Sequence, residues 1–124
     1  MGLGREGVHE TTADLQKLFK TAVREAKGDL TVAASLLGFR GRHKRRCLSD
    51  SISANFPQPQ GWVGILGTAI EAVKEDTNCP LNARRRRLNN LAVAIGFLRT
   101  AFGELNSLEA LRKQKEKAMQ DLRA

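Results

Sequence analysis

One long stretch of this chain repeats its apolar residues at steps of three and four. The repeat, called here the heptad series, consists of Leu88, Leu91, Ile95, Leu98, Phe102 and Leu105. An α-helix, with about 3.6 residues per turn, brings such positions onto one face, whereas a strand needs a step of two. A face of this length has to pack against other helices or against a second copy of the chain, and this restricts the fold to helical packing.

Two earlier stretches have the same helical spacing. One spans residues 15–26 and the other spans residues 62–73. Gly28 follows the first of them, as expected for a glycine that ends a helix in the left-handed conformation. Asp29 can then cap a short helix that ends at Gly38, because an aspartate oxygen accepts hydrogen bonds from the free N–H groups at a helix N-terminus.

These patterns predict an all-α chain in two parts. A basic third helix over residues 42–51 completes an N-terminal three-helix unit, and Pro57 and Pro59 favour an extended connection after it. The predicted order is a disordered N-terminus (1–11), a helix-turn-helix module (12–51), a linker (52–61) and a helical dimerisation region (62–124), for which a coiled coil is one arrangement.

The charge of the chain is concentrated in two places. Lysine and arginine number 21 against 13 aspartates and glutamates, for a net charge of +8. Residues 40–46, the basic segment, contain five of the cations, and residues 84–87, the arginine run, contain four. Without these nine, 12 cations face 13 acidic residues. Clustered cations repel one another, and a bound anion would relieve that repulsion, so two such clusters on a nearly neutral background indicate anion-binding surfaces. The alternative is that both clusters are simply solvated.

The sequence KGDLTVAASLLGFRGRHKRRCL, residues 27–48, resembles the helix-turn-helix of Fis-type regulators, which is also found at the C-terminus of NtrC-like activators. The matching positions are Gly28, Asp29, Ala33, Ala34, Leu37, Gly38, Phe39, Arg45, Arg46 and Leu48. The chain departs from the family pattern at Lys44, where an apolar residue is usual, and at Gly41, where a polar residue or arginine is usual. The motif also lies near the N-terminus here. The resemblance implies a module that binds double-stranded DNA.

In modules of this family the third helix enters the major groove. The resemblance therefore makes the basic segment and its histidine the candidates for base and phosphate contacts, namely Arg40, Arg42, His43, Lys44, Arg45 and Arg46. Arginine can bind a guanine edge through two hydrogen bonds. Thr31, early in the second helix, is a candidate for a phosphate contact. Arg84, Arg85 and Arg87 are predicted to form a second phosphate-contacting patch, with a solvated helix start as the alternative.

The heptad series is the candidate dimer interface. A small module of this kind commonly binds two half-sites about 34 Å apart on one face of the DNA, and a dimer supplies the second module. We expect the series to pair two copies of the chain. A hairpin with the helix that contains Trp62, formed within one chain, is the other interpretation.

The residue pattern gives no support to other chemistries. His43 and Cys47 share a helix face, but His9 and Cys79 lie in unrelated segments, so no metal site is expected. No nucleophile with its base, acid pair or phosphate-binding glycine loop occurs at a useful spacing, so we expect neither an enzyme nor a cofactor. The two cysteines indicate no disulfide framework, and the longest apolar run, residues 62–70, is too short for a membrane span. A cytoplasmic protein is expected.

The sequence therefore predicts a homodimeric regulator of transcription that binds specific sequences of double-stranded DNA. The alternative is a basic helical interaction protein that binds RNA or an acidic protein surface, for example as an inhibitor or adaptor. An arginine-rich segment that becomes ordered on RNA would accommodate Gly41 and Lys44 more readily than a packed recognition helix does.

Overall fold

The computed structural model describes residues 12–123, which form helices and short connections with no strand. The helices are α2 (Thr12–Glu25), α3 (Leu30–Leu36), α4 (Lys44–Asn55), α5 (Gln60–Glu75), α6 (Leu81–Phe102) and α7 (Asn106–Arg123). The predicted all-α fold is confirmed. The predicted disordered N-terminus, residues 1–11, lies outside the described residues. None of the helices over residues 12–123 has the length and apolar content that crossing a membrane requires.

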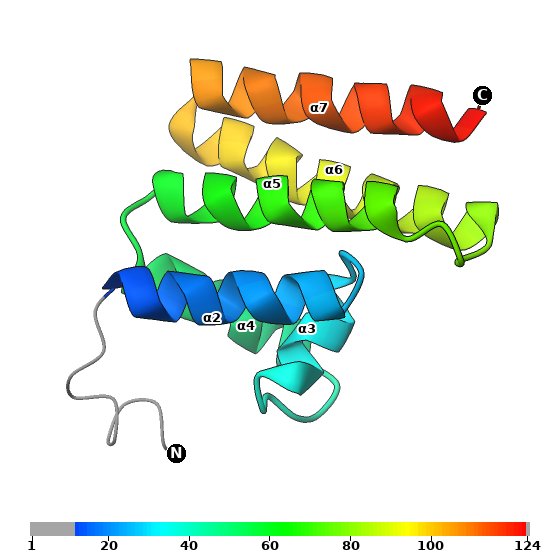
Figure 1. The fold of residues 1–124 in the computed structure, drawn as a ribbon. Coiled ribbons are helices and arrows are strands. Elements are labelled where there is room, and N and C mark those ends of the chain that lie inside the picture. Colours follow the sequence, from blue (N-terminus) through cyan, green and yellow to red (C-terminus); the bar gives the residue numbers. More distant parts are fainter. Residues whose placement is uncertain (1–11, 124) are drawn as a thin grey trace.

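Helix α5 lies at the centre of the fold. It contacts α2, α4, α6 and α7, and Figure 1 shows α2 on one side of it with α6 and α7 on the other. Its buried residues include Ile65, Leu66, Ala69, Ile70 and Val73, which have no exposed surface. Burying a large aliphatic side chain contributes about 1.5–3 kcal/mol, so the surroundings of α5 supply much of the stability of the fold.

The turn between α2 and α3 lies close beneath α5. Lys27 and Gly28 have positive φ values of 58° and 84°, and this left-handed turn ends α2, as predicted for Gly28. A Cβ atom on Gly28 would lie 2.6 Å from the carbonyl oxygen of Ala69 on α5. The absence of a side chain therefore lets the turn approach the backbone of the central helix.

Asp29 caps α3 as the sequence predicts. Its Oδ1 accepts hydrogen bonds from the backbone N–H groups of Thr31, at 2.9 Å, and Val32, at 3.2 Å. The buried residues Leu30, Ala33 and Ala34 form the inner face of this seven-residue helix. Because two of them are alanines, α3 can pack closely against both α2 and α4.

The helix that carries the end of the basic segment differs from the prediction at both of its ends. The sequence predicts residues 42–51, whereas α4 covers Lys44–Asn55. Ile52 and the residue that follows the helix, Phe56, are both buried, and this packing extends the helix through a serine-rich sequence. The predicted linker 52–61 is corrected accordingly, because its first four residues belong to α4 and its last two belong to α5.

The heptad series from Leu88 to Phe102 forms one face of α6, its last member, Leu105, lies in the connection that follows, and most of the face is covered within a single chain. Leu88, Leu91, Ile95 and Leu98 are buried in the core that α6 shares with α5 and α7. Phe102 and Leu105 are 40% and 39% exposed. The predicted dimer interface is therefore corrected for its four buried members. The physical reason is that α5 and α7 present apolar faces within the same chain, and the leucine face of α6 packs against them.

Replacing Gly28 by alanine is expected to destabilise the fold. The added Cβ would overlap the Ala69 carbonyl and would force an alanine into the left-handed conformation. Together these effects should lower the free energy of unfolding by about 2–4 kcal/mol. Urea denaturation followed by circular dichroism measures this loss.

Gly38→Ala is the matched control for this substitution. Gly38 has a φ of 97°, but nothing lies within 4 Å of the position that its Cβ would take. The only remaining cost is that of holding an alanine in the left-handed conformation, which should lower the free energy of unfolding by about 1–2 kcal/mol. Equal losses in the two variants would contradict the close approach of Gly28 to α5.

Candidate nucleic-acid interface

The basic segment, residues 40–46, occupies the start of α4 and the connection that precedes it. Residues 40–43 belong to the connection, and residues 44–46 form the first turn of the helix. Gly38 and Gly41 have φ values of 97° and 88°, a conformation that glycine adopts without strain. These two glycines let the connection change direction before α4 begins, so that part of the cationic charge lies on a loop.

The polar side chains of the basic segment differ in exposure. Arg40, Arg42, His43 and Arg46 are exposed, whereas Lys44 and Arg45 are half-buried. Arg42 and His43, predicted on the helix, precede it in the structure. Helix α4 turns Leu48 toward the core, and its helical period places Arg46 and Asp50 on the solvent-exposed side. The surface that α4 offers to a partner therefore begins at Arg46.

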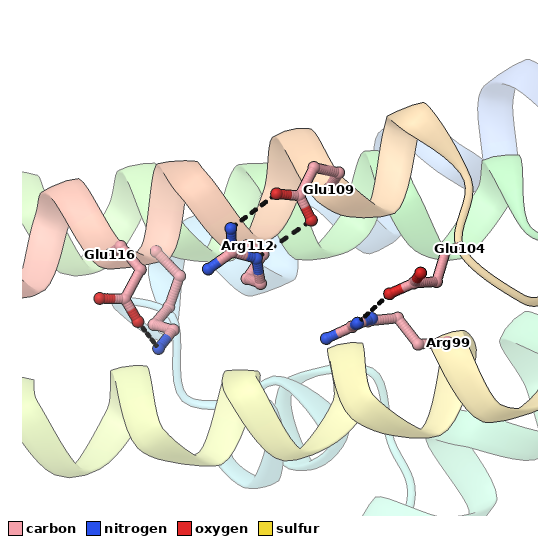
Figure 2. Close-up of polar contacts among 6 residues, drawn as sticks. Arg99, Glu104, Glu109, Arg112 and Glu116 are labelled. Carbon is pink, nitrogen blue, oxygen red and sulfur yellow. Dashed lines mark hydrogen bonds and ion pairs between the residues drawn. The ribbon is translucent and has the colours of Figure 1, made fainter.

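No cation of the basic segment forms an ion pair or a side-chain hydrogen bond with any residue of the described range 12–123. The C-terminal helices differ, as Figure 2 shows: Arg99 pairs with Glu104, and Arg112 holds Glu109 through Nε at 3.0 Å and Nη2 at 2.6 Å. Hydrogen bonding to Arg112 holds the pKa of Glu109 below its ordinary value. The fold neutralises Arg99 and Arg112 internally, whereas the cations of the basic segment have no such partner among the described residues.

The N-terminus of α4 carries cations where a helix favours negative charge. Its first turn contains no acidic residue, and the side chain of its N-cap residue, His43, forms no capping hydrogen bond. The free N–H groups and the helix dipole make this end positive, so each cation there is disfavoured by about 0.3–1 kcal/mol. An anion bound at this end would offset the repulsion and accept hydrogen bonds from the free N–H groups.

Arg87 of the arginine run is part of the fold and is not a free cation. Its Nη1 donates to Oδ2 of Asp76 at 3.0 Å and to the backbone carbonyl of Lys27 at 3.3 Å. The Arg87 and Asp76 side chains are only 20% and 13% exposed. Arg87 therefore ties α6 to the end of α5 and to the turn after α2, and its predicted phosphate contact is corrected.

The exposure of the other arginines in the run depends on the side of α6 on which each one lies. Arg84 and Arg85 are half-buried, and the Nε of Arg84 is buried with no hydrogen-bond partner among the described residues. Arg86, which the prediction omits, is the exposed member. The sequence contains the signal for this: Arg84 and Arg87 each lie four residues before a buried leucine, Leu88 or Leu91, and Arg85 lies three before Leu88, whereas Arg86 has neither spacing.

Thr31 lies at a helix N-terminus that is already occupied. The backbone N–H of Thr31 donates to the Asp29 carboxylate, as does that of Val32. A phosphate at the same place would meet a negative charge in place of free N–H groups. The predicted phosphate contact of Thr31 is therefore limited to its exposed side chain.

A small cavity lies where α3, α4 and α6 meet. Thr31, Arg45 and Arg87 line it together with Asp29 and Asn90. The fold thus brings three of the predicted candidates, from three separate segments, to one place. Arg45 lies toward this inner junction, whereas Arg46 lies on the solvent-exposed side of the same helix.

The structure assigns no metal ligand set to the cysteines. Cys47 is exposed, Cys79 is half-buried, and both are free thiols. Within residues 12–123, no three histidine, cysteine, aspartate or glutamate side chains lie together in a way that could hold a metal ion. His9 lies outside the described residues.

Comparison of the chain with protein-family models, with curated proteins and with solved structures found no match. The assignment of a function therefore depends on the geometry and the charge described above.

Replacing Arg87 by glutamine is expected to destabilise the protein. The substitution leaves the largely buried Asp76 carboxylate without its cation, and removing a hydrogen bond to a charged group lowers the free energy of unfolding by about 1.5–3 kcal/mol. Urea denaturation measures the change. Arg86→Gln removes the same charge from the same helix at an exposed position and should change stability by less than about 0.5 kcal/mol. Similar values for both variants would assign the effect to net charge.

Proposed function

We propose that the chain binds double-stranded DNA through α4 and the connection that precedes it. The observation that carries this proposal is the unpaired state of all five cations of the basic segment within the described structure. Each lysine or arginine that approaches a phosphate releases condensed counterions, and this supplies a large share of the affinity of proteins for DNA. The seven-residue segment is short enough for its cations to contact adjacent phosphates of one duplex.

In this proposal α4 enters the major groove by its N-terminal turn. Arg46 faces solvent and can reach a guanine edge, and Asp50, one turn later on the same side, can accept from the amino group of cytosine. Arg40 and Arg42, on the connection, contact the phosphates that flank the groove and fix the position of the helix. Base contacts of this kind discriminate by about 1–3 kcal/mol each, which is the basis for sequence-specific regulation.

The resemblance to the Fis-type helix-turn-helix supports this orientation. The family pattern has glycines at the positions of Gly28 and Gly38, and both have positive φ here. Helices α2, α3 and α4 pack in sequence, with α3 in contact with both neighbours. Lys44, at a position where the family has an apolar residue, is half-buried as the first residue of α4, where its alkyl chain can pack while its ammonium group reaches water.

We further propose that the regulator acts as a homodimer, because one module contacts too few bases to select a site. The four buried leucine and isoleucine residues of the heptad series are not available for this contact. The exposed members, Phe102 and Leu105, lie at the C-terminal end of α6 and in the connection to α7. They are the part of the series that can still contact a second copy.

Binding to duplex DNA tests the main proposal. We expect the protein to enrich a defined sequence from a pool of random duplexes, and the double variant Arg42→Ala/Arg46→Ala to bind that sequence at least about tenfold more weakly, because it removes two cations from the interface. The slope of log affinity against log salt should fall by about one for each phosphate that the variant no longer neutralises. Fluorescence anisotropy of a labelled duplex measures both quantities.

The control for this experiment is Lys117→Ala, which removes a cation at an exposed position of α7. It should leave the affinity within about twofold, since the charge lies outside the proposed interface. A duplex-RNA competitor is included in each titration. Binding without sequence enrichment, or a preference for the RNA, would overturn the DNA proposal and favour the alternative of a basic RNA-binding or protein-binding adaptor.

Sedimentation velocity tests the dimer. We expect the free protein, or its complex with the enriched duplex, to contain two chains, and Phe102→Ser/Leu105→Ser to shift the protein toward the monomer because it removes apolar contact area. Val32→Ser, an exposed apolar residue on α3, is the control and should not change the mass. A single chain under all conditions would contradict the homodimer and leave DNA binding by a monomer.

A further inference from the structure

A large groove lies between α4 and α6. Its volume is about 810 Å³, and the side chain of Trp62, at the start of α5, contributes to its floor. Pockets that bind small molecules in proteins measure about 300–1,000 Å³, so the groove is of the size that holds one such ligand.

The α6 side of the groove is apolar and uncovered. Phe97, Val93 and Phe102 line it and are 72%, 56% and 40% exposed. Phe97 is more exposed than any other large hydrophobic residue in the described part of the chain. Apolar side chains that line a groove and remain in contact with water mark a surface that a ligand with an apolar body would cover.

The α4 side of the groove is polar and positively charged. Arg45, Arg46, Ser49 and Ser53 line this side, and the residues that line the groove include no acid. The hydroxyl oxygen of Ser53 accepts a hydrogen bond from Nε1 of Trp62 at 3.3 Å, which fixes the indole of the floor. Neither arginine has an ion-pair partner among residues 12–123, so an anionic group at this edge would pair with them without displacing an internal contact.

We propose that the groove binds a small anionic amphiphile, that is, an apolar chain or ring system with one carboxylate or phosphate group. The apolar body lies on Phe97, Val93 and Trp62, and the anionic group pairs with Arg45 and Arg46. The charge complementarity and the separation of the groove into one apolar and one cationic side favour this ligand class. A free fatty acid and an aromatic carboxylate share this chemistry.

The position of the arginines gives the groove a regulatory consequence. Arg46 is also the first residue of the proposed DNA-contacting side of α4, so an anionic ligand paired with it competes with DNA phosphate and base contacts. This consequence depends on the proposed function, whereas the binding of the amphiphile does not. The amphiphile therefore acts as an effector that releases the protein from DNA.

The fluorescence of Trp62 tests the ligand directly. Trp62 is the one tryptophan of the chain and lines the groove, so its emission reports an occupant. Dodecanoate, 4-phenylbutyrate and dodecyltrimethylammonium are titrated in separate arms, below any micelle-forming concentration. We expect saturable binding of one dodecanoate or one phenylbutyrate per chain and at least about tenfold weaker binding of the cationic amphiphile, and the stronger of the two anionic arms identifies the body that fits.

Two variants locate the site. Phe97→Ser changes an exposed residue, and Arg45→Gln removes a cation of the rim; each should weaken binding of the anionic probe at least about fivefold. Leu36→Ser, at an exposed position of α3, and Lys117→Gln are the matched apolar and charge controls and should bind as the unchanged chain does. Circular dichroism of each variant confirms that it is folded.

Several outcomes would overturn the proposal. They are binding that does not saturate, equal binding of the cationic probe, or equal binding by Phe97→Ser. Sedimentation of Phe97→Ser is measured in parallel: a loss of dimer without any amphiphile binding would assign the groove to a second copy of the chain. Displacement of labelled duplex by dodecanoate is measured separately, so that a failure of DNA binding and a failure of the groove ligand remain distinguishable.

Discussion

The burial of α5 is the constraint on which the rest of the structure depends. Its residues Ile65, Leu66, Ala69, Ile70 and Val73 have no exposed surface, and their spacing places them together on one broad face of the helix. A helix with a broad apolar face is stable in water only when other helices cover that face. Helices α2, α4, α6 and α7 provide that cover, and the side-chain-free Gly28 allows the turn after α2 to reach the backbone of α5.

This packing also determines which surfaces remain for function. The leucine face of α6 is buried because it packs against α5. The residues on the outward side of α6, such as Val93 and Phe97, therefore remain exposed in the described chain. The same packing holds Leu48 of α4 in the core and turns Arg46 outward. The acids near the connection between α6 and α7 are paired with arginines of those two helices (Figure 2). The cations at the start of α4 have no ion-pair partner among the described residues.

The helices could be predicted from the sequence because their signals are local. Apolar spacing located α5 and α6, and Gly28 and Asp29 located the end of α2 and the start of α3. The partner of an apolar face is not a local property: the heptad series has the same spacing whether it packs within one chain or between two. The end of α4 was missed for a similar reason, since burial of Ile52 outweighs the weak helix preference of its serines.

DNA and the amphiphile bind the same arginines through different interactions, so a change in salt concentration affects the affinity of the two ligands differently. DNA presents many phosphates, so its binding depends on the number of cations and weakens steeply as salt rises. An amphiphile pairs one anionic group with Arg45 and Arg46 and gains most of its affinity from apolar contact with Phe97 and Trp62, which salt does not screen. Rising salt therefore shifts the balance toward the groove ligand, because it weakens the contacts of DNA while the apolar side of the groove is unaffected.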